Sequence, residues 1–506
     1  WDFTNTWILD ASVNDGYPTF SFASHVPTSE VPSGDGSSAT PYLIANLGNL
    51  IWVSENSASW NAKYFKQTED INALFSKNLD SGQGLTPIGT DSFTPFKGYY
   101  DGNGKTISNA YINRTAPYIG IFGHIGGAAE IRSLNIVDAN VTGTTTNQQA
   151  TGLGILVGSA IDNVSTIVFR DINISGTLTL KDVDTEYASV GGMAGSVGND
   201  VDIDNVETNV SIISQDTTLE NTLGGLIGYM NNDSDGTAQD IIQQSGAKGS
   251  IVSTSTKEHI GGLIGTLQGG NSTYVNKIRY SYASTTITAL SNSTSGSVGG
   301  FIGRFYGSAT WLYNSYTTSN ITVGSSDRVG GFFGLIDFTP ASVVTNFFNC
   351  YSASTITGGS DGAFGGFRTN NSTDAVKIWD TFWDTDSTAN SNAFASTSGA
   401  TFNNSYAKTT VEMKNIDTYL DHVKMGYYWD FVIETDNGSN DYWDIDNANG
   451  TINGGYPFLA WENGSAIAYD PYMAVEPSNY VASASCTNAP CEIATLENIR
   501  WLSENS

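Results

Sequence analysis

The side chains best suited to chemistry are carboxylates and amides spaced like calcium ligands. From Asn231 to Gly236, oxygen-bearing side chains stand at alternate positions before a glycine, as they do at the start of a calcium-binding loop. An acidic residue at position 12 completes such a loop, but Ile242 occupies that position here. The segment therefore predicts either a weak calcium site or a polar turn. Its candidate ligands are Asn231, Asp233 and Asp235.

A second group of candidate calcium ligands alternates along a strand-like segment. Asp200, Asp202 and Asp204 would point to one face of a single β-strand. Without a partner these charges would repel one another, which favours a bound cation; the alternative is a solvated acidic face. Calcium is therefore the one cofactor that the sequence suggests. A further acidic patch, able to hold a cation between successive modules, comprises Asp436, Asp441, Asp444 and Asp446.

Catalytic constellations cannot be found in the sequence. Polysaccharide lyases and hydrolases need paired carboxylates, or a basic residue beside calcium, within one groove. The sequence has no Gly-x-Ser-x-Gly elbow, His-Glu-x-x-His zinc motif or phosphate-binding loop, and its four histidines are isolated. We therefore expect no enzymatic activity. The arginines are few and scattered along the chain: Arg132, Arg170, Arg279, Arg304, Arg328 and Arg368.

Covalent modification is the remaining chemistry that residue types suggest. Cys486 and Cys491 lie five residues apart in a loop rich in Ser, Pro and Asn, where a small disulfide can close, whereas Cys350 is alone. Asn-x-Ser/Thr sequons are frequent, as chance would supply in a chain rich in these residues, so glycosylation depends on the source. The candidate sequons are those at Asn113, Asn140, Asn271 and Asn320.

The charge balance excludes two classes of partner. The 506 residues include 50 Asp and Glu against 21 Lys and Arg, which gives a net charge of −29. Nucleic acids and anionic membranes are bound by clusters of basic residues, so we expect neither as a partner. Apolar runs also stay well short of the ~18 residues of a membrane helix, so we expect no membrane insertion. Hydrophobic residues, at 39% of the chain, are sufficient for a core.

A short glycine repeat decides the predicted architecture. The pattern Gly-Gly-apolar-x-Gly, as in Gly224 to Gly228, recurs at steps of 31–38 residues. Short β-type runs separate the copies, and Tyr282, Tyr316 and Tyr351 are each followed five residues later by an isoleucine. The glycines before the apolar position are Gly120, Gly154, Gly192, Gly225, Gly262, Gly300, Gly331 and Gly366.

Units of this length, without amphipathic helices between them, predict an all-β solenoid. Each unit of about 35 residues would supply one coil of two or three strands, and stacking would bury the apolar face that one coil leaves open. We expect inward ladders of Leu, Ile and Phe, and Ser and Thr on solvated faces. The glycines are expected to allow corners of positive φ and close approach of backbones.

A much longer repeat predicts a tandem array of modules. Trp52 to Ser57 returns as Trp501 to Ser506, 449 residues later, and Asn14, Tyr17 and Pro18 return near residue 453. The predicted divisions are a tail of the preceding module at 1–24, one complete module at 25–466, and a linker with the start of the next module at 467–506. Within the complete module we expect an opening segment at 41–112, glycine-repeat coils at 113–375 and a closing segment at 376–466.

Two short helices are expected to cover the ends of the solenoid. Thr409 and Glu412 fit a capping box, which predicts a helix over 409–421. Leu47, Leu50 and Ile51 predict another helix over 46–56. Covered ends matter because an exposed solenoid end is a sheet edge that invites polymerisation.

The glycine repeats and their flanks resemble the GLUG motif of large bacterial surface proteins. The resemblance extends to Phe96–Ile107 on the opening side, and to Phe382–Asp386, Lys408–Lys414 and Gly455–Phe458 on the closing side. It implies a right-handed parallel β-helix at a cell surface and carries over no catalytic residue. The chain departs from the pattern in the units around residues 154 and 192, where the tyrosine positions are lost.

These observations together predict a structural or adhesive repeat of a large secreted microbial fibre or adhesin. Its partners would be neighbouring modules or copies of itself, with surface glycans as further candidates, and its location extracellular or at the cell surface. A glycan-binding β-helix module is the main alternative, and a polysaccharide-active enzyme is a more distant one.

Overall fold

Alternation along the longest strands decides which side of the chain is buried. In β16 (Val201–Ser214), Val201 and Ile203 are buried, whereas Asp202 and Asp204 between and after them are only half-buried. A strand of this kind turns one apolar face inward, and in the stack of coils the other sheets cover that face.

The computed structural model forms two compact units, Trp1–Met413 and Lys414–Ser506. It describes residues 7–8, 17–20, 26–144, 151–162, 164–181, 187–216, 220–231, 240–255, 257–269, 275–289, 296–307, 310–324, 328–337, 345–358, 362–368, 376–388, 392–393, 400–420, 423–424, 427–432, 441–446 and 452–463. The predicted boundaries of a repeating module stay a prediction, and the closing segment at 376–466 is divided between the two units.

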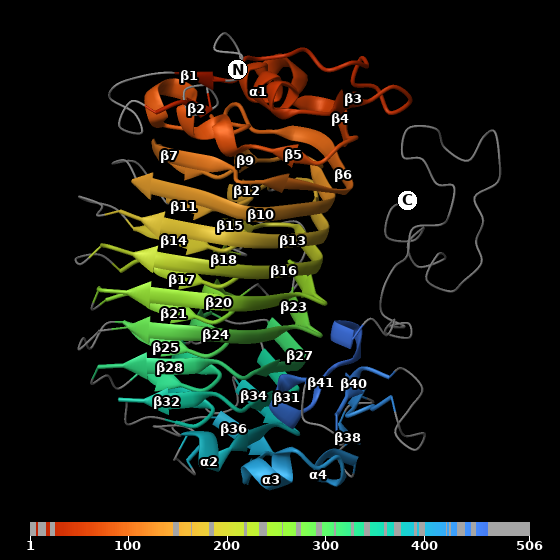
Figure 1. Cartoon of the computed structure of the whole chain (residues 1–506). Helices are drawn as coiled ribbons and strands as arrows, with labels where there is room; N and C mark the ends of the chain where they lie inside the picture. Colours follow the sequence, from red (N-terminus) through yellow and green to blue (C-terminus); the bar gives the residue numbers. More distant parts are fainter. Residues whose placement is uncertain are drawn as a thin grey trace, which may run out of the picture. The chain divides into compact units, whose positions relative to one another are not determined.

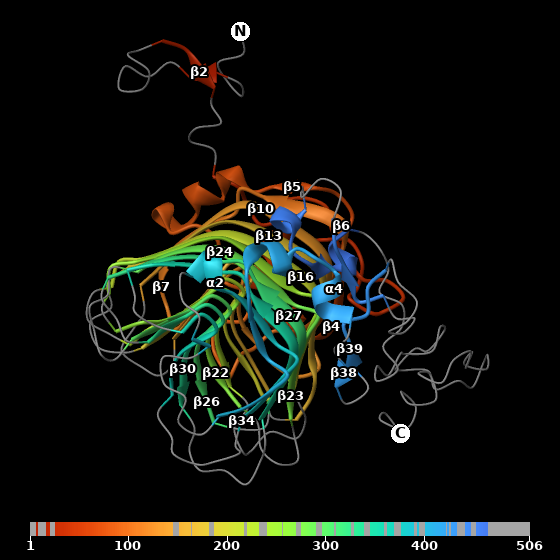
Figure 2. The same cartoon turned by 90° about the horizontal axis from the view of Figure 1, so that it is seen from below.

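The first unit is a parallel β-solenoid, which confirms the predicted fold class. One coil of the solenoid contributes strands to three parallel sheets in turn, and each strand pairs with its equivalents in the coils before and after (Figure 1). Viewed along the stack, strands such as β10, β13 and β24 form one wall and β22, β26 and β30 another (Figure 2). Paired residues of neighbouring coils, such as Val190 and Leu223, are separated in the sequence by the same step as the glycine repeats.

The first sheet, called the broad sheet below, contains the longest strands. Its strands are β3 (Tyr42–Ile44), β4 (Asn61–Gln67), β5 (Ile71–Asn72), β6 (Lys97–Ser108), β7 (Tyr111–Thr115), β10 (Glu130–Thr144), β13 (Ile167–Leu180), β16, β19 (Ile241–Gln243), β20 (Gly246–Ser253), β23 (Asn276–Arg279), β24 (Tyr282–Ala289), β27 (Thr310–Thr317), β28 (Asn320–Val323), β31 (Thr345–Ser352), β32 (Thr355–Thr357), β34 (Val376–Trp379), β35 (Phe382–Asp384), β36 (Ala400–Asn403) and β37 (Tyr406–Lys408).

The other two sheets of the solenoid have shorter strands. The seven-stranded sheet comprises β8 (Tyr118–Ile119), β11 (Thr151–Gly154), β14 (Ala188–Gly191), β17 (Thr222–Gly224), β21 (His259–Gly261), β25 (Ser297–Gly299) and β29 (Val329–Gly330). The eight-stranded sheet comprises β9 (Phe122–Ile125), β12 (Val157–Ile161), β15 (Ala194–Gly198), β18 (Ile227–Asn231), β22 (Ile264–Gln268), β26 (Ile302–Tyr306), β30 (Phe333–Asp337) and β33 (Gly365–Arg368).

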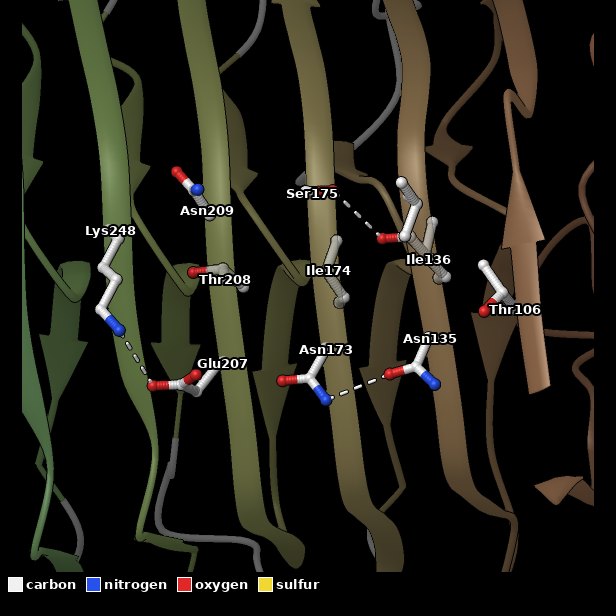
Figure 3. A pocket seen from close by; sticks show the side chains of 11 residues that line it. Thr106, Asn135, Ile136, Asn173, Ile174, Ser175, Glu207, Thr208, Asn209 and Lys248 are labelled. Carbon is white, nitrogen blue, oxygen red and sulfur yellow. Dashed lines mark hydrogen bonds and ion pairs between the residues drawn. The ribbon is translucent and has the colours of Figure 1, made fainter. Parts of the chain in front are cut away.

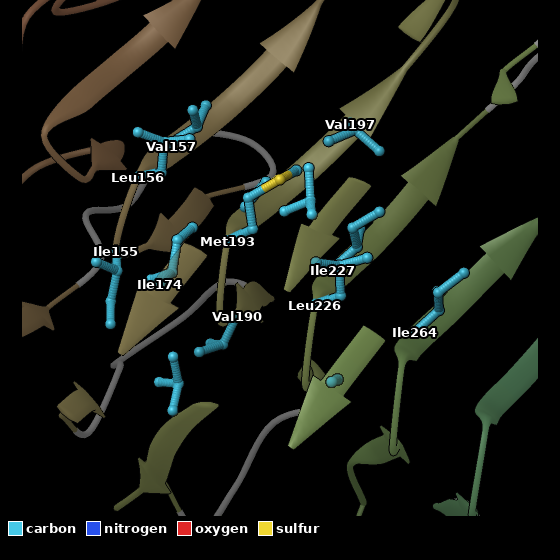
Figure 4. Close-up of a cluster of buried hydrophobic side chains, with 14 of the residues drawn as sticks. Ile155, Leu156, Val157, Ile174, Val190, Met193, Val197, Leu226, Ile227 and Ile264 are labelled. Carbon is cyan, nitrogen blue, oxygen red and sulfur yellow. The ribbon is translucent and has the colours of Figure 1, made fainter. Parts of the chain in front are cut away.

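Aliphatic ladders fill the space between the sheets. Leu226 and Ile227 of one coil and Ile264 of the next are completely buried, next to Met193 and Val190 of the coil before (Figure 4). The predicted inward ladders of Leu, Ile and Phe are therefore present. Burial of these side chains is the main favourable contribution to the stability of each coil.

The repeated glycines form the corner between the two shorter sheets, and their role is close approach. A Cβ on Gly224 would lie 1.9 Å from the carbonyl oxygen of Ile227, and one on Gly195 would lie 2.2 Å from the amide nitrogen of Leu153. Side chains cannot fit at such distances, as predicted. The expectation of positive φ is wrong for these glycines, since none of the described motif glycines has a positive φ.

A regular column of positive φ values is found in the broad sheet, at residues that are not glycine. One residue in each of nine coils has φ between 45° and 55°, and each directly follows a residue in register with its equivalents. Asn and Asp tolerate this left-handed conformation better than other residues with a Cβ. The column is Ser133, Asp171, Asn205, Gln244, Tyr280, Asn314, Asn349, Asp380 and Asn404.

In the broad sheet, buried hydroxyls stand directly after residues of the positive-φ column and form a column of their own. The hydroxyl of Ser281 donates to the carbonyl of Arg279 at 2.8 Å and accepts from the amide of Ser245 at 3.4 Å, and Ser315 repeats the pattern one coil later. Cys350 occupies the next position, with its thiol 3.3 Å from the carbonyl of Phe348. The expectation that Ser and Thr belong on solvated faces is therefore wrong for this column, which satisfies backbone groups inside the coil.

Helices lie near both ends of the solenoid. Helix α1 (Leu47–Glu55) begins after Asn46, whose side chain accepts from the amide of Asn49 at 2.9 Å, and it fits the predicted range. The capping box forms, since the Thr409 amide donates to Glu412 at 2.8 Å. The single helix predicted over 409–421 is wrong, because two short helices replace it: α3 (Thr410–Met413) in the first unit and α4 (Asp417–Leu420) in the second. Helix α2 (Thr385–Thr388) precedes them.

The remaining elements are short. They are η3 (Ser57–Ser59), η4 (Leu74–Gly82) and the antiparallel pair β1 (Trp7–Ile8) and β2 (Thr19–Phe20) in the first unit, with β38 (Val423–Lys424), β39 (Tyr427–Tyr428), β40 (Trp443–Asp444), β41 (Phe458–Leu459), η5 (Asn453–Gly455) and η6 (Ala460–Asn463) in the second. Trp429 packs against Trp443 and Tyr419, with ring centroids 4.6 and 4.7 Å apart, and these rings form the core of the second unit.

Candidate binding groove

A groove lined by amide, charged and aliphatic side chains crosses five neighbouring strands on the outer face of the broad sheet. It consists of two adjoining hollows, of about 280 and 680 Å³, over β6, β10, β13, β16 and β20. Asn135 and Asn173 line both hollows, so the two hollows adjoin. Figure 3 shows the lining of the smaller one. From here on this surface is called the broad-sheet groove.

In-register pairing brings residues far apart in the sequence into the groove. Thr106, Asn135, Asn173 and Glu207 pair in that order across four strands and form one outward column. In later coils the same column holds Gly246 and then Tyr282, Tyr316 and Tyr351, whose rings are stacked and buried. The groove therefore lies where the aromatic column gives way to smaller polar side chains.

Amide groups run along the floor of the groove. Asn173 Nδ2 donates to Asn135 Oδ1 at 3.1 Å (Figure 3). Asn135 Nδ2 in turn donates to the carbonyl of Gly104 at 3.2 Å. These bonds leave Asn173 Oδ1 and the exposed amide of Asn209 without a hydrogen bond to any described residue. Both are therefore available to a ligand.

Two adjacent arginines, with a carboxylate on either side, form the next column. Asp101, Arg132, Arg170 and Asp204 pair in that order. Arg132 contacts Asp101 at 3.3 Å, and Arg170 contacts Asp204 at 3.5 Å. Lys248 similarly pairs with Glu207 at 3.4 Å, and the Tyr282 hydroxyl bonds to the same carboxylate. The expectation that the arginines are scattered is therefore wrong for Arg132 and Arg170, which are neighbours.

The predicted alternating carboxylates are only partly brought together. Asp202 and Asp204 lie on β16, but Asp200 precedes the strand with a φ of 85° and is buried. Burial, and then the charge of Asp204, raises the pKa of Asp202 to about 6. One oxygen of Asp202 and one of Asp204 are buried without a described hydrogen-bond partner. The described residues contain no group of three acidic, His or Cys side chains placed to hold a metal, so calcium stays a prediction.

The predicted calcium loop is described only at its edge. Asn231 ends β18, and its Oδ1 is buried without a hydrogen-bond partner among described residues. Asp233 and Asp235 lie outside the described residues. Beyond them, Asp240 accepts the amides of Asp200 and Val201 at 2.9 Å each through Oδ1, and burial raises the pKa of Asp240 to about 7.

A buried acidic pair was not predicted from the sequence. Asn221 Nδ2 donates to Asp216 at 2.8 Å and to Glu258 at 3.3 Å, so the two carboxyl groups share one amide. The hydroxyls of Ser214, at 2.6 Å, and of Ser253 donate to the two oxygens of Glu258. Burial raises the pKa of Glu258 to about 7. These residues are spread over 45 positions without a motif, so only the coil register reveals them.

The candidate modification sites differ in exposure. Asn140 on β10 and Asn320 on β28 are exposed, and Asn113 on β7 is half-buried, with Lys181 3.2 Å from its Oδ1. Asn271, Cys486 and Cys491 lie outside the described residues, so that glycosylation site and the disulfide stay predictions. Cys350 is a buried free thiol whose pKa is raised by burial.

Comparison with known proteins finds partial relatives. No protein-family model matches the chain. Halomucin of Haloquadratum walsbyi is 29% identical over 217 residues, which are 42% of this chain and 2% of that protein. A provisionally described Gly-rich membrane protein of Evansella cellulosilytica is 31% identical over 156 residues, 29% of this chain and 17% of that protein. The chain thus matches only a small part of either relative.

One solved structure covers most of the chain at low similarity. A provisionally assigned immunoglobulin A1 protease from Bacteroides ovatus is 18% identical with a TM-score of 0.41, and the match covers 85% of this chain and 95% of that one. This likeness is too low to bear on function. The β-solenoid fold and the two sequence relatives are consistent with a structural repeat of a surface protein. Among the described residues, no helix is long and apolar enough to cross a membrane.

Proposed function

We propose that this chain is a structural and adhesive repeat segment of a large secreted microbial surface fibre, of the GLUG-repeat type, and that it has no catalytic activity. The observation that carries the proposal is the pairing of coils. Each described strand of the solenoid pairs with its equivalents in neighbouring coils, column by column, from β4 to β37. The stability of such a molecule comes mainly from contacts between neighbouring coils along the stack. An elongated stack of this kind suits a spacer that holds contact surfaces away from the cell.

Electron microscopy of the native protein, beside its mass on a denaturing gel, tests the fibre. We expect a thin fibre formed by a chain much larger than 53.9 kDa, the mass of these 506 residues. A native protein of about this mass that forms compact particles would contradict the proposal.

The absence of catalysis is tested separately. Arg132 and Arg170, the basic side chains best placed in the groove, are already ion-paired with carboxylates, so neither is a free base or a free anion site. We expect no release of reducing ends or unsaturated products from neutral or uronic-acid polysaccharides. Turnover that disappears in Arg170→Ala would show that the groove is an active site.

A glycan-binding module is the second candidate, and the broad-sheet groove favours it. The groove combines amides, charge-paired arginines and a volume of several hundred Å³ on an open face. Display of such a groove along a fibre is one way for a surface protein to adhere.

A further inference from the structure

We propose that the broad-sheet groove binds a neutral, linear polysaccharide that lies along the stack of coils, with about one sugar unit over each strand. The proposal deepens the adhesive part of the proposed function by naming a site and a ligand class, and it does not depend on fibre formation.

The repeat of the groove fits a polymer of hexoses. Neighbouring strands of a sheet are ~4.8 Å apart, which is close to the length of one hexose unit in a linear glycan. Thr106, Asn135, Asn173 and Glu207 present one polar side chain per strand in a single outward column. A chain of sugars along this column would meet one side chain per unit without a change of register.

The free hydrogen-bonding groups match sugar hydroxyls. A hydroxyl both donates and accepts, and so does a side-chain amide. The Asn173–Asn135 bond fixes the two amides in place and leaves Asn173 Oδ1 as an acceptor in the groove. Asn209, two residues beyond Glu207 on the same face of β16, adds an exposed amide. Amides held in position before binding lose little conformational freedom when a ligand arrives.

The charge balance of the groove selects a neutral ligand. In the larger hollow Asp101 and Asp171 offset Arg132 and Arg170, and in the smaller one Glu207 offsets Lys248. This balance stands out in a chain with a net charge of −29. An acidic polysaccharide would need unpaired cations, but Arg132 and Arg170 already contact carboxylates. Uronic-acid and sulfated polymers are therefore disfavoured.

An aromatic pair flanks the groove at its first coils. Tyr64 and Tyr99 are stacked with centroids 4.4 Å apart and planes at 9°, and both are half-buried. Tyr99 stands two residues before Asp101 on β6, so the two side chains share the outer face. Tyrosine offers an apolar ring together with a polar hydroxyl, which suits the C–H faces and hydroxyls of a sugar.

The test uses the full chain produced in a host without N-glycosylation, because Asn173 and Asn209 stand in sequons. Binding of linear neutral hexasaccharides of glucose, mannose and galactose is measured by calorimetry beside a hexamer of galacturonic acid. We expect at least one neutral hexamer to bind, and the double variant Asn135→Ala/Asn173→Ala to weaken it at least tenfold. Tyr99→Ala is expected to weaken the same hexamer.

The matched control is Asn320→Ala. Asn320 is also an exposed outward asparagine of the broad sheet, bonded to the next coil through Thr355 at 2.7 Å, but it lies outside the groove. Its loss should leave the affinity unchanged. Hydrogen exchange of the free and bound wild-type chain places the site without relying on any variant, and protection should rise in β6, β10 and β13.

Three results would overturn the proposal. They are the absence of binding by every neutral hexamer, a preference for the acidic hexamer, and neutral binding that survives the double variant with protection elsewhere. Loss of fibres in the microscope would leave a positive binding result intact, so the two proposals fail separately.

Discussion

The lone described cysteine shows how a single residue fits a column. Cys350 stands where neighbouring coils have Ser281 and Ser315, and the amide of Ser315 donates to its sulfur. We predict that Cys350→Ser changes local stability by less than about 1 kcal/mol, because a serine repeats the contacts of the coils before. Cys350→Val should cost about 1–3 kcal/mol, since it leaves that buried amide without an acceptor. Hydrogen exchange of β27 and β31 measures both, and equal losses would contradict the prediction.

The column of positive φ gives a second prediction at the residue scale. Both polar ends of the Asn349 side chain are buried without a hydrogen-bond partner in the part of the chain that the structure describes, so backbone conformation explains why an asparagine stands there. Asn349→Val should destabilise its coil by about 1–2 kcal/mol, because β-branched residues strongly disfavour this region. Gln244 has a φ of 45° in the same column, and Gln244→Asn should stabilise by a few tenths of a kcal/mol. Melting curves of the two variants should shift in opposite directions, and a shared direction would refute the explanation.

At the scale of the element, the glycine corner between the two shorter sheets is the place where adding a single Cβ atom should destabilise the coil. A Cβ on Gly225 would lie 2.1 Å from the carbonyl of Gly262 and 2.7 Å from Ala247 Cβ. Backbone must therefore shift, and we predict that Gly225→Ala destabilises this corner by about 2 kcal/mol or more. Gly126→Ala is the matched control, because its nearest contact would be an ordinary 3.4 Å. Exchange should rise in β17 and β18 for the first variant alone; comparable effects of the two variants would count against close approach.

The elements also show why sequence predicted the fold better than the groove. The period of the glycines, with Tyr282, Tyr316 and Tyr351 between them, was enough to predict coils of about 35 residues. Their register could not be read, because the column of positive φ mixes residue types as different as Ser133 and Tyr280. Without register, residues 38 apart such as Asn135 and Asn173 could not be seen as neighbours.

One sequence signal did point to the groove. The units around residues 154 and 192 lack the tyrosine of the later repeats, and in register Asn173 and Glu207 stand in its place. The loss of the tyrosine marks the floor of the groove. The prediction that Asp200, Asp202 and Asp204 share one strand face fails for a related reason. Asp200 has a positive φ and lies outside the strand, and this backbone feature cannot be recognised from the alternation of residue types.

For the whole molecule, buried acids make stability depend on pH. Burial raises the pKa of Glu258 from 4.5 to about 7 and that of Asp240 from 3.8 to about 7. Folded chains hold these protons where unfolded chains release them, so this stabilisation is full at low pH and lost as pH rises through 7. Burial lowers the pKa of His259 from 6.5 to about 3, which opposes the trend only below pH 6.5.

The window above pH 6.5 therefore isolates the carboxyl groups. We predict that stability falls as pH rises from 6.5 to about 7.5, with a slope of up to about 1.4 kcal/mol per pH unit for each buried acid. It then levels off at higher pH, where the folded chain has released these protons as well. Glu258→Gln should flatten the dependence, and Glu55→Gln, at an exposed position, should leave it unchanged. Hydrogen exchange of β20 and β21 across this range measures the effect, and a stability that rises with pH would contradict it.

The net charge of −29 sets the last prediction, which separates general repulsion from specific calcium. Like charges on a compact chain destabilise it, and salt screens them over ~10 Å at 0.1 M and ~3 Å at 1 M. Sodium chloride should therefore raise the melting temperature smoothly, while the affinity for a neutral glycan stays constant because the groove is charge-balanced. If the candidate ligands near Asp202 and Asn231 hold calcium, calcium chloride should add a saturable rise beyond sodium or magnesium chloride at equal ionic strength. If the melting temperature rises identically with the three salts at equal ionic strength, charge screening explains the whole effect, and calcium is not a cofactor.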